Sequence, residues 1–259
     1  SSINGSWIEV PGSSYFGTSD FCVMQYEAKD DSGVATSQPS GTPWLNINFT
    51  DARAECSQLN SEHSSFSGTF RMITNREWMT IARNAEQQPE NWNTSTVGVG
   101  SMFRGYSNGT FGDGSRDGTN PYSGINYRIL ELSNGEEIWD LAGNVWQWVD
   151  MLEDGSSINN ANACPGEIEF SQCSSMEDDF SKNNSQALGL PIERELGPLG
   201  DYDSTNGVGQ IYSLSGSPRA LSRGGDWTSG AGAGAFAVLL GRAPSTTDPR
   251  LGFRCSYEP

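Results

Sequence analysis

The sequence predicts one α+β domain with two helices, short strands and a high content of loops. Residues 50–59 and 75–86 carry apolar side chains at helical spacing. Residues 21–26 alternate along the chain as a strand does, and both faces are largely apolar, which is typical of a buried strand. The 259 residues include 31 glycines and are only 35% hydrophobic, so we expect a compact core and long loops.

Each predicted helix has its own start signal. Thr50 is the expected N-cap of the first helix. The second opens with the segment 74–77 (Thr-Asn-Arg-Glu), a capping box in which the two side chains satisfy free backbone N–H groups. We interpret the apolar stripes as core faces and not as a cofactor site: Ala52, Cys56 and Leu59 in the first helix, and Trp78, Ile81, Ala82 and Ala85 in the second.

Three stretches are predicted to be loops. Residues 30–43 are polar and interrupted by Gly and Pro. Residues 89–135 are rich in Gly, Asn and Ser, so we expect a long loop with short strands. Residues 150–221 form a loop-rich, acidic elaboration, and loops of that length are usually functional or partly disordered. The 259 residues are enough for one large domain or two small ones, and we expect one domain over 1–259.

Asp113, Asp117 and Asn120 lie among glycines in the second of these stretches. Oxygen ligands on a flexible loop suit calcium. The spacing is not that of an EF-hand loop, so turn chemistry is the favoured explanation for these residues.

The formal net charge of −17 bounds the partners. A nucleic-acid surface needs basic patches, and anionic membranes attract basic segments, so we expect neither partner. No apolar run reaches the length of a membrane span. No signal peptide is evident, which leaves secretion open because such a segment is removed from mature proteins. We expect a monomer.

The five cysteines are Cys22, Cys56, Cys164, Cys173 and Cys255. None forms a CxxC pair and the chain has one histidine, His63, so a zinc site is not expected. Cys164 and Cys173 flank a short loop and could form a local disulfide. Buried free thiols in a reducing compartment are the alternative for all five.

The most distinctive stretch is 222–255, SRGGDWTSGAGAGAFAVLLGRAPSTTDPRLGFRC. It shows no sustained helical or strand period, so we expect loops held between a Gly-Gly turn and a closing GFRC strand. We call one set of its positions the frame, because they suit packing: Arg223, Gly224, Gly225, Trp227, Phe236, Ala243, Pro244, Gly252, Phe253, Arg254 and Cys255. The remaining set, which we call the permissive positions, is mostly small or polar: Asp226, Thr228, Ser229, Gly232, Leu239, Gly241, Arg242, Thr246, Asp248 and Arg250.

A second distinctive stretch, 136–148 (EEIWDLAGNVWQW), places aromatic and aliphatic residues around an Ala-Gly-Asn turn. With the RGG-aromatic opening and the APS…GFRC close of 222–255, it resembles the formylglycine-generating enzyme (sulfatase-modifying factor) family. The resemblance implies a C-type-lectin-like fold with short antiparallel strands. Such folds often bridge the first helix to the last strand, which implies a disulfide between Cys56 and Cys255 and leaves Cys22 over.

More narrowly, 222–255 resembles the variable region of diversity-generating retroelement proteins. Their mutagenesis acts on adenines, so an Asn codon becomes NNC or NNT, which cannot encode Lys, Glu, Gln, Met or Trp. Residues 224–256 contain none of these except the frame residue Trp227. The resemblance implies a display protein whose permissive positions form one solvent-exposed, hypervariable binding patch. Its partner would be an unknown protein or cell-surface ligand, and its location surface-displayed, virion-associated or secreted.

The same family wraps a calcium ion with the motif that resembles 136–148. Carried over, the ligands are the side chains of Asp140 and Gln147 and the carbonyls of Gly143 and Val145. The family usually has Glu where this chain has Gln147, and one lost charge should weaken the site. The alternative is that Asp140 only caps the turn.

The enzymes of the family bind copper(I) through two cysteines five residues apart, and those positions correspond to Gly234 and Leu239. Neither side chain supplies a thiolate, so we expect no copper and no oxidase activity. GxSxG, Walker A and HExxH motifs are also missing from the sequence. The alternative function is an oxidoreductase resembling these enzymes, or an inactive homologue of them.

Overall fold

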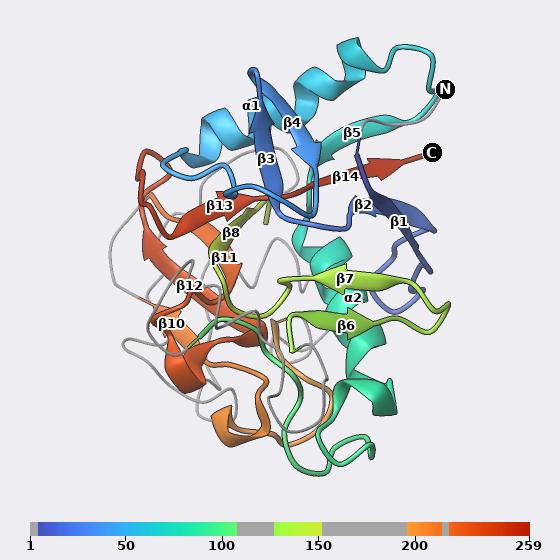
Figure 1. Cartoon of the computed structure of the whole chain (residues 1–259), viewed down its shortest axis with the longest axis vertical. Coiled ribbons are helices and arrows are strands. Elements are labelled where there is room, and N and C mark those ends of the chain that lie inside the picture. Colours follow the sequence, from blue (N-terminus) through green and yellow to red (C-terminus); the bar gives the residue numbers. More distant parts are fainter. Residues whose placement is uncertain (1–4, 108–126, 152–195, 214–217) are drawn as a thin grey trace.

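A computed structural model shows a mixed α+β architecture and describes residues 5–107, 127–151, 196–213 and 218–259 (Figure 1). The α+β prediction is confirmed. One sheet has the order β1-β2-β14-β5 and a second has the order β10-β12-β11-β8-β13. The first sheet contains Trp7–Val10 (β1), Phe21–Met24 (β2), Cys255–Glu258 (β14) and Thr69–Met72 (β5). The second contains Ile211–Ser213 (β10), Gly234–Arg242 (β12), Ala220–Gly224 (β11), Trp146–Val149 (β8) and Leu251–Phe253 (β13).

Smaller elements complete the described part of the chain. Two hairpins are formed by Ala28–Asp31 (β3) with Val34–Ser37 (β4), and by Ile129–Glu131 (β6) with Glu137–Trp139 (β7). Three short 3-10 helices span Pro89–Asn91 (η1), Ser204–Asn206 (η3) and Gly230–Gly232 (η4). None of the helices in this part of the chain is both long and apolar enough to cross a bilayer.

The two expected helices are Phe49–Glu62 (α1) and Asn75–Glu86 (α2). The capping box of α2 is confirmed, because Thr74 Oγ1 accepts from the backbone N–H of Glu77 and Glu77 Oε2 accepts from that of Thr74. The N-cap predicted for α1 is wrong by two residues. Asn48 Oδ1 accepts from the N–H of Asp51 at 2.9 Å, so an amide oxygen caps this helix earlier than Thr50 would.

The loop predicted at 30–43 contains a hairpin. Ser32 and Gly33 both have positive φ, at 59° and 86°, the left-handed pair that a two-residue hairpin turn needs. This turn lets β3 pair with β4 although the residues at its tip are polar and exposed. The polar composition made these two strands undetectable in the sequence, because a hairpin whose turn is exposed to solvent needs no continuous apolar run.

Two further strand predictions are corrected. The stretch 222–255 holds the nine-residue β12 and not only loops. Parallel pairs also occur, since β10 pairs with β12 and β13 pairs with β8 in parallel. The chain leaves β13 and enters β14 after one residue, Arg254, and so passes from the second sheet to the first (Figure 1). This crossing leaves β13 parallel to β8 while β14 runs antiparallel to β2 and β5.

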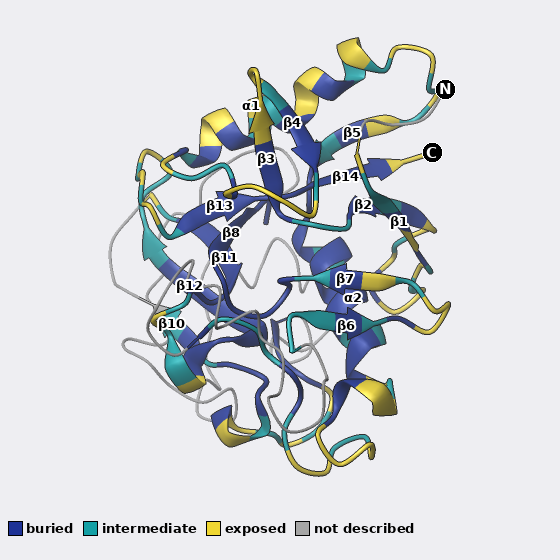
Figure 2. Cartoon of the chain, in the orientation of Figure 1, coloured by how far each residue is buried: buried dark blue, intermediate teal, exposed yellow. Residues whose placement is uncertain are grey.

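The second sheet separates two apolar clusters. One cluster includes α2, and its members include Trp78, Leu221, Val238 and Leu240. Because side chains alternate along a strand, the intervening residues of the second sheet face the other cluster. That second cluster includes α1, and its members from the sheet include Trp146, Trp148, Ala237 and Leu239. Figure 2 shows the buried residues running through β8, β11 and α2, whereas α1 exposes its outer side.

The disulfide implied by the family resemblance is present. Cys56 of α1 is bonded to Cys255 of β14 across 199 residues of sequence, and Cys22 is a half-buried free thiol. The bond therefore ties the first helix to the last strand. The Cys164–Cys173 pair and the loop with Asp113, Asp117 and Asn120 lie outside the described residues.

Candidate ligand-binding cleft

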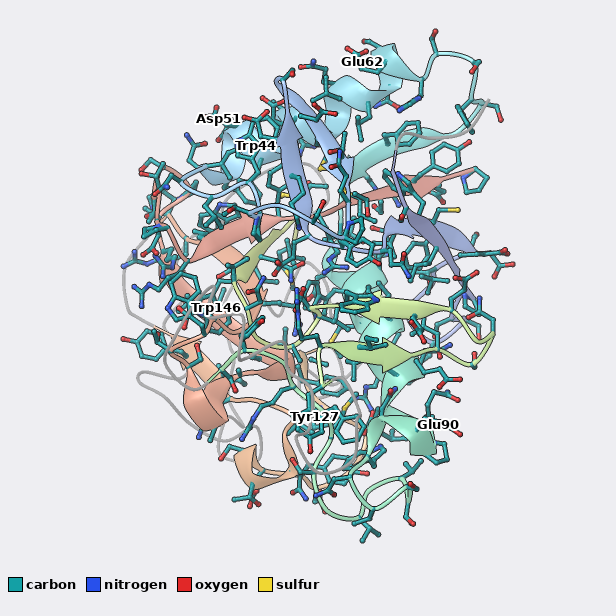
Figure 3. All side chains as sticks on the ribbon, in the orientation of Figure 1. Trp44, Asp51, Glu62, Glu90, Tyr127 and Trp146 are labelled. Carbon is teal, nitrogen blue, oxygen red and sulfur yellow. A yellow bond between two sulfur atoms is a disulfide. The ribbon has the colours of Figure 1, made fainter. Side chains whose placement is uncertain are left out.

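A cleft of about 440 Å³ opens beside the second sheet, at the C-terminal part of β12. All permissive positions except Thr246 and Asp248 line it. Three residues outside the predicted set complete its wall: Trp146 of β8, Gln210, and Tyr212 of β10. Figure 3 shows Trp146 on the side of the molecule where β8, β10 and β12 lie. The volume is within the range of small-molecule sites, about 300–1,000 Å³.

Strand alternation turns part of β12 toward this cleft. Leu239 faces the cleft, while Val238 and Leu240 on either side pack into the cluster with α2. Tyr212 of β10 is the register partner of Leu239, so an aromatic ring and an aliphatic side chain meet at the wall. Gly241, two residues after Leu239, returns to the same face without a side chain and leaves that space open.

Asp226 organises the loop at one rim of the cleft. Its Oδ1 accepts hydrogen bonds from the N–H of Thr228 at 2.7 Å, the Thr228 hydroxyl at 2.7 Å and the Ser229 hydroxyl at 3.0 Å. The loop is anchored from outside by Trp227, whose N–H donates to the carbonyl of Asn144 at 3.0 Å. A short carboxylate is therefore what folds this loop, and the Asp226 side chain is only 3% exposed.

Two arginines share one carboxylate at the opposite rim. Arg242 Nη1 lies 2.6 Å from Asp248 Oδ2, and Arg250 Nε lies 3.2 Å from Asp248 Oδ1. Burial raises the pKa of Asp248, but hydrogen bonds from Arg242 and Arg250 outweigh it and lower the pKa to about 2. Arg250 Nη1 also lies 3.6 Å from Asp226 Oδ2, which links the two rims. Asp248 thus acts on the cleft through the arginines that line it.

The expectation of one fully exposed patch is corrected. Asp226, Gly232 and Leu239 are buried, and only Thr228 is exposed; the other permissive positions are half-buried. The reason is that these residues form a concave wall in which each shields the next. Thr246 lies on a turn beyond the cleft, where its N–H donates to the carbonyl of Ala243 at 2.9 Å.

The frame residues also differ in how far they are buried. Arg223, Phe236, Phe253, Arg254 and Cys255 are fully buried. Trp227, Ala243 and Pro244 are half-buried, because they flank the rim loops and not the core. Trp227 is therefore not fully enclosed in the core, as a frame position was expected to be.

Sequence reasoning missed three lining residues. Trp146 belongs to the 136–148 motif, and its side chain packs in the α1 cluster while also lining the cleft. Gln210 and Tyr212 belong to the stretch 150–221, which is predicted to be a loop-rich elaboration. Their pairing with β12 joins residues separated by more than twenty positions, and no local pattern in the sequence signals such a parallel pair.

Comparison with known proteins identifies the family. A family model described as the sulfatase-modifying factor enzyme 1-like domain matches residues 6–259. The chain belongs to this family. The assignment made from the two motifs is thereby confirmed, and the domain has the C-type-lectin-like fold of the formylglycine-generating-enzyme type. No curated protein matches the chain.

Several solved structures resemble this chain at low identity. PvdO from Pseudomonas aeruginosa is 13% identical with a TM-score of 0.42, covering 98% of this chain and 92% of that one. Treponema denticola variable protein 1 is 14% identical with a TM-score of 0.38, covering 99% and 94%. The P3c variant of Major Tropism Determinant is 15% identical with a TM-score of 0.35, covering 96% of this chain and 48% of that one. The family assignment rests on the model that matches residues 6–259.

Gly234, which was expected from the sequence resemblance to stand at the first copper-cysteine position, has no room for a side chain. A Cβ atom built on Gly234 would lie 2.1 Å from the carbonyl carbon of Val208 and 2.3 Å from the nitrogen of Gly209. These are backbone atoms, which cannot turn aside. The second position, Leu239, is an apolar part of the cleft wall.

The residues expected to hold calcium do not fit the ion in this arrangement. Both carboxylate oxygens of Asp140 bind the guanidinium of Arg128, at 2.8 and 2.6 Å. Gln147 Oε1 accepts from Arg254 Nε at 2.6 Å, and its amide nitrogen donates to the carbonyl of Asp140 at 2.8 Å. A cation would have to displace two guanidinium groups. The described residues also hold no cluster of three or more Asp, Glu, His or Cys suited to a metal.

A buried carboxyl lies beside the same turn. Glu27 is fully buried and accepts hydrogen bonds from the side-chain amides of Asn144 and Gln147. Burial, and secondarily the charge of Asp140, raises the pKa of Glu27 to about 8. Asp140 itself has a φ of 55°, and its N–H donates to the carbonyl of Arg128 at 2.8 Å. These contacts favour the alternative in which Asp140 holds the turn.

Proposed function

We propose that this domain is a ligand-binding display protein of the kind that diversity-generating retroelements diversify. In this proposal the buried frame keeps the backbone fixed, and the permissive positions set which ligand the cleft accepts. We further propose a protein or cell-surface ligand and a monomeric, non-catalytic domain that binds no copper.

One observation carries the proposal. The permissive positions were selected because they are mostly small or polar and lie between packing residues. All of them except Thr246 and Asp248 meet around one cleft with Trp146, Gln210 and Tyr212. The frame residue Phe236, which lies between them, and Phe253, which follows them, are fully buried. A segment that alternates between packed and cleft-lining residues can change its ligand surface without changing its core. Loops and strand ends held on a rigid scaffold are where binding residues are usually found.

The Cys56–Cys255 disulfide supports a location in an oxidising environment. We therefore propose that the domain is secreted, surface-displayed or carried on a virion. The disulfide joins α1 to β14, away from the cleft, so it braces the scaffold without restricting the residues that would vary.

A library test separates the permissive positions from the frame. Each permissive position except Asp226, whose carboxylate folds its own loop, is encoded as NNC, and the chain is displayed and sorted for folded molecules. A matched library randomises Phe236, Val238, Leu251 and Phe253 in the same way. We expect most members of the first library to stay folded and most of the second to unfold. Equal tolerance in the two libraries would contradict a diversifiable surface on a fixed frame.

The second candidate function is an enzyme, or an inactive relative of one, as the family allows. The observation against copper chemistry is the packing of Gly234 against the Val208–Gly209 backbone. Incubation with copper, oxygen and a cysteine-containing sulfatase peptide checks it directly, and we expect no aldehyde. Formation of aldehyde would support the enzyme and contradict the display protein.

A further inference from the structure

We propose that the cleft binds an aromatic group that carries a carboxylate, such as an aromatic residue beside an acidic side chain or at a chain terminus. This inference rests on the proposed function and adds the chemical class of its ligand. It follows from which charges of the cleft are covered, which are exposed, and what lies between them.

The carboxylates of the cleft are hidden. Asp226 Oδ1 accepts three hydrogen bonds from its own loop, Oδ2 lies 3.6 Å from Arg250 Nη1, and the side chain is 3% exposed. The side chain of Asp248 is 15% exposed and binds both Arg242 and Arg250. A cationic ligand would therefore have to compete with the guanidinium groups that already lie beside both acids.

The exposed charge is positive. The Arg250 side chain is 39% exposed, more than any other charged group of the cleft. Its three hydrogen bonds, to the two oxygens of Asp248 and to the Thr228 hydroxyl, are long at 3.2, 3.3 and 3.4 Å. Because these bonds are long and the guanidinium group is half-exposed, its N–H groups can donate to both oxygens of a ligand carboxylate.

Arg242 supplies a second unmet donor. Its Nε–H is enclosed and has no acceptor in the described part of the chain, although Nη1 is paired with Asp248. A buried donor without a partner costs free energy. A carboxylate that settles between the two arginines offers it an acceptor after a small rotation of the guanidinium group.

The rest of the wall suits an aromatic ring. Leu239 and Trp146 are apolar and only 6% and 7% exposed, and Tyr212 pairs with Leu239 in the adjacent strand. Gly232 and Gly241 leave the space between them open. A ring in this space would contact Leu239, Trp146 and Tyr212 while its acidic group reaches Arg250.

The formal net charge of −17 is compatible with a ligand that carries a carboxylate. At physiological ionic strength the Debye length is about 8 Å, so distant surface charges are screened while contacts inside the cleft are not. The net charge slows the approach of an anion more than it weakens the bound pair. We therefore expect a slower association rate at low salt, with the preference for a carboxylate retained.

Three probes that share one ring test the inference on the full chain: N-acetyl-L-tyrosine, N-acetyl-L-tyrosinamide and tyramine. Their binding is followed by NMR titration of the protein. We expect the carboxylate to bind at least about tenfold more tightly than the amide, and the amine to bind more weakly than either. In Arg250→Gln the advantage of the carboxylate should vanish, whereas Arg76→Gln, on α2 and outside the cleft, should retain it.

Two blocking variants locate the probe and distinguish the two proposals. Gly241→Trp fills the cleft from its floor and Thr228→Trp covers it from the exposed rim, so at least one should fold and abolish binding. If the amide or the amine binds as well as the carboxylate, and the blocking variants abolish it, the ligand class is wrong but the cleft is a binding site. If no probe binds, or binding survives both blocks, the proposed site fails together with the inference.

Discussion

The guanidinium of Arg128 binds both carboxylate oxygens of Asp140, with Nε 2.8 Å from Oδ1 and Nη2 2.6 Å from Oδ2. Together with the bond from Arg254 to Gln147, this ion pair puts positive charge where the family resemblance implies calcium. We expect calcium to leave the melting temperature unchanged, because a ligand stabilises only a state that it binds. Thermal melts with millimolar calcium and with chelator measure this.

A matched pair of variants sharpens the calcium test. Asp140→Asn should lower the melting temperature equally with and without calcium, because it breaks the ion pair with Arg128. Arg128→Ala combined with Gln147→Glu restores the acidic ligand set and should create a calcium response. A wild-type melting temperature that rises with calcium, and no longer rises in Asp140→Asn, would show that Arg128 gives way to the ion.

Two glycines of β12 should differ sharply in their tolerance of a methyl group. Gly234→Ala forces backbone apart at Val208, and overpacking of this kind costs roughly 1–3 kcal/mol or more. Gly241→Ala adds the same methyl group on the open side of the cleft and should change the free energy of unfolding by less than about 0.5 kcal/mol. Denaturant unfolding of the two variants makes the comparison, and equal losses would contradict the packing described for Gly234.

The disulfide should contribute strongly to stability. It closes a loop of 199 residues, for which the chain-entropy model gives about 5 kcal/mol. Cys56→Ala with Cys255→Ala, or reduction of the wild type, should lower the free energy of unfolding by an amount approaching this. Cys22→Ala is the control, since Cys22 is unpaired. A reduced protein as stable as the oxidised one would mean that α1 and β14 need no covalent link.

The pH dependence at the cleft follows from Asp248. Its pKa in the folded protein is lowered to about 2, so its ionised form contributes stability at pH values above its ordinary pKa. This contribution is lost as the pH falls from about 4 toward 2. We therefore expect Asp248→Asn to be less stable than the wild type at pH 6 and the gap to close near pH 2. Asp201→Asn, at an exposed position elsewhere, should leave the curve unchanged, and a gap independent of pH would contradict the ion network.

The sequence identified the elements whose signals are local. The capping box at Thr74 lies within four residues, and the frame of 222–255 is visible as a run of Gly, Arg and aromatic positions. The site was less accessible. That Leu239 and Gly241 face the same cleft follows once β12 is known to be a strand, but nothing near Gln210 or Tyr212 predicts that β10 pairs with it in parallel. Burial of Asp226 depends on bonds from Thr228 and Ser229, which only the folded loop supplies.

The division of 222–255 into frame and permissive positions predicts how strongly substitutions there lower the free energy of unfolding. Phe236 is fully buried in the cluster with α2, and the guanidinium of Arg83 lies 5.8 Å from its ring centroid. Phe236→Ala should lower the free energy of unfolding by about 3–5 kcal/mol, the range for buried aromatic residues. Trp227→Ala should cost less, because Trp227 is half-buried beside the rim and not in the core.

Thr228→Ala is the permissive counterpart. Thr228 is exposed, and its hydroxyl donates to Asp226 while accepting from Arg250, so its loss should cost about 1 kcal/mol at most. Chemical denaturation of Phe236→Ala, Trp227→Ala and Thr228→Ala gives the order directly. An equal loss in Phe236→Ala and Thr228→Ala would mean that the rim is as essential to folding as the frame. Such a rim could not vary freely, and the proposal of a diversified cleft would fall with it.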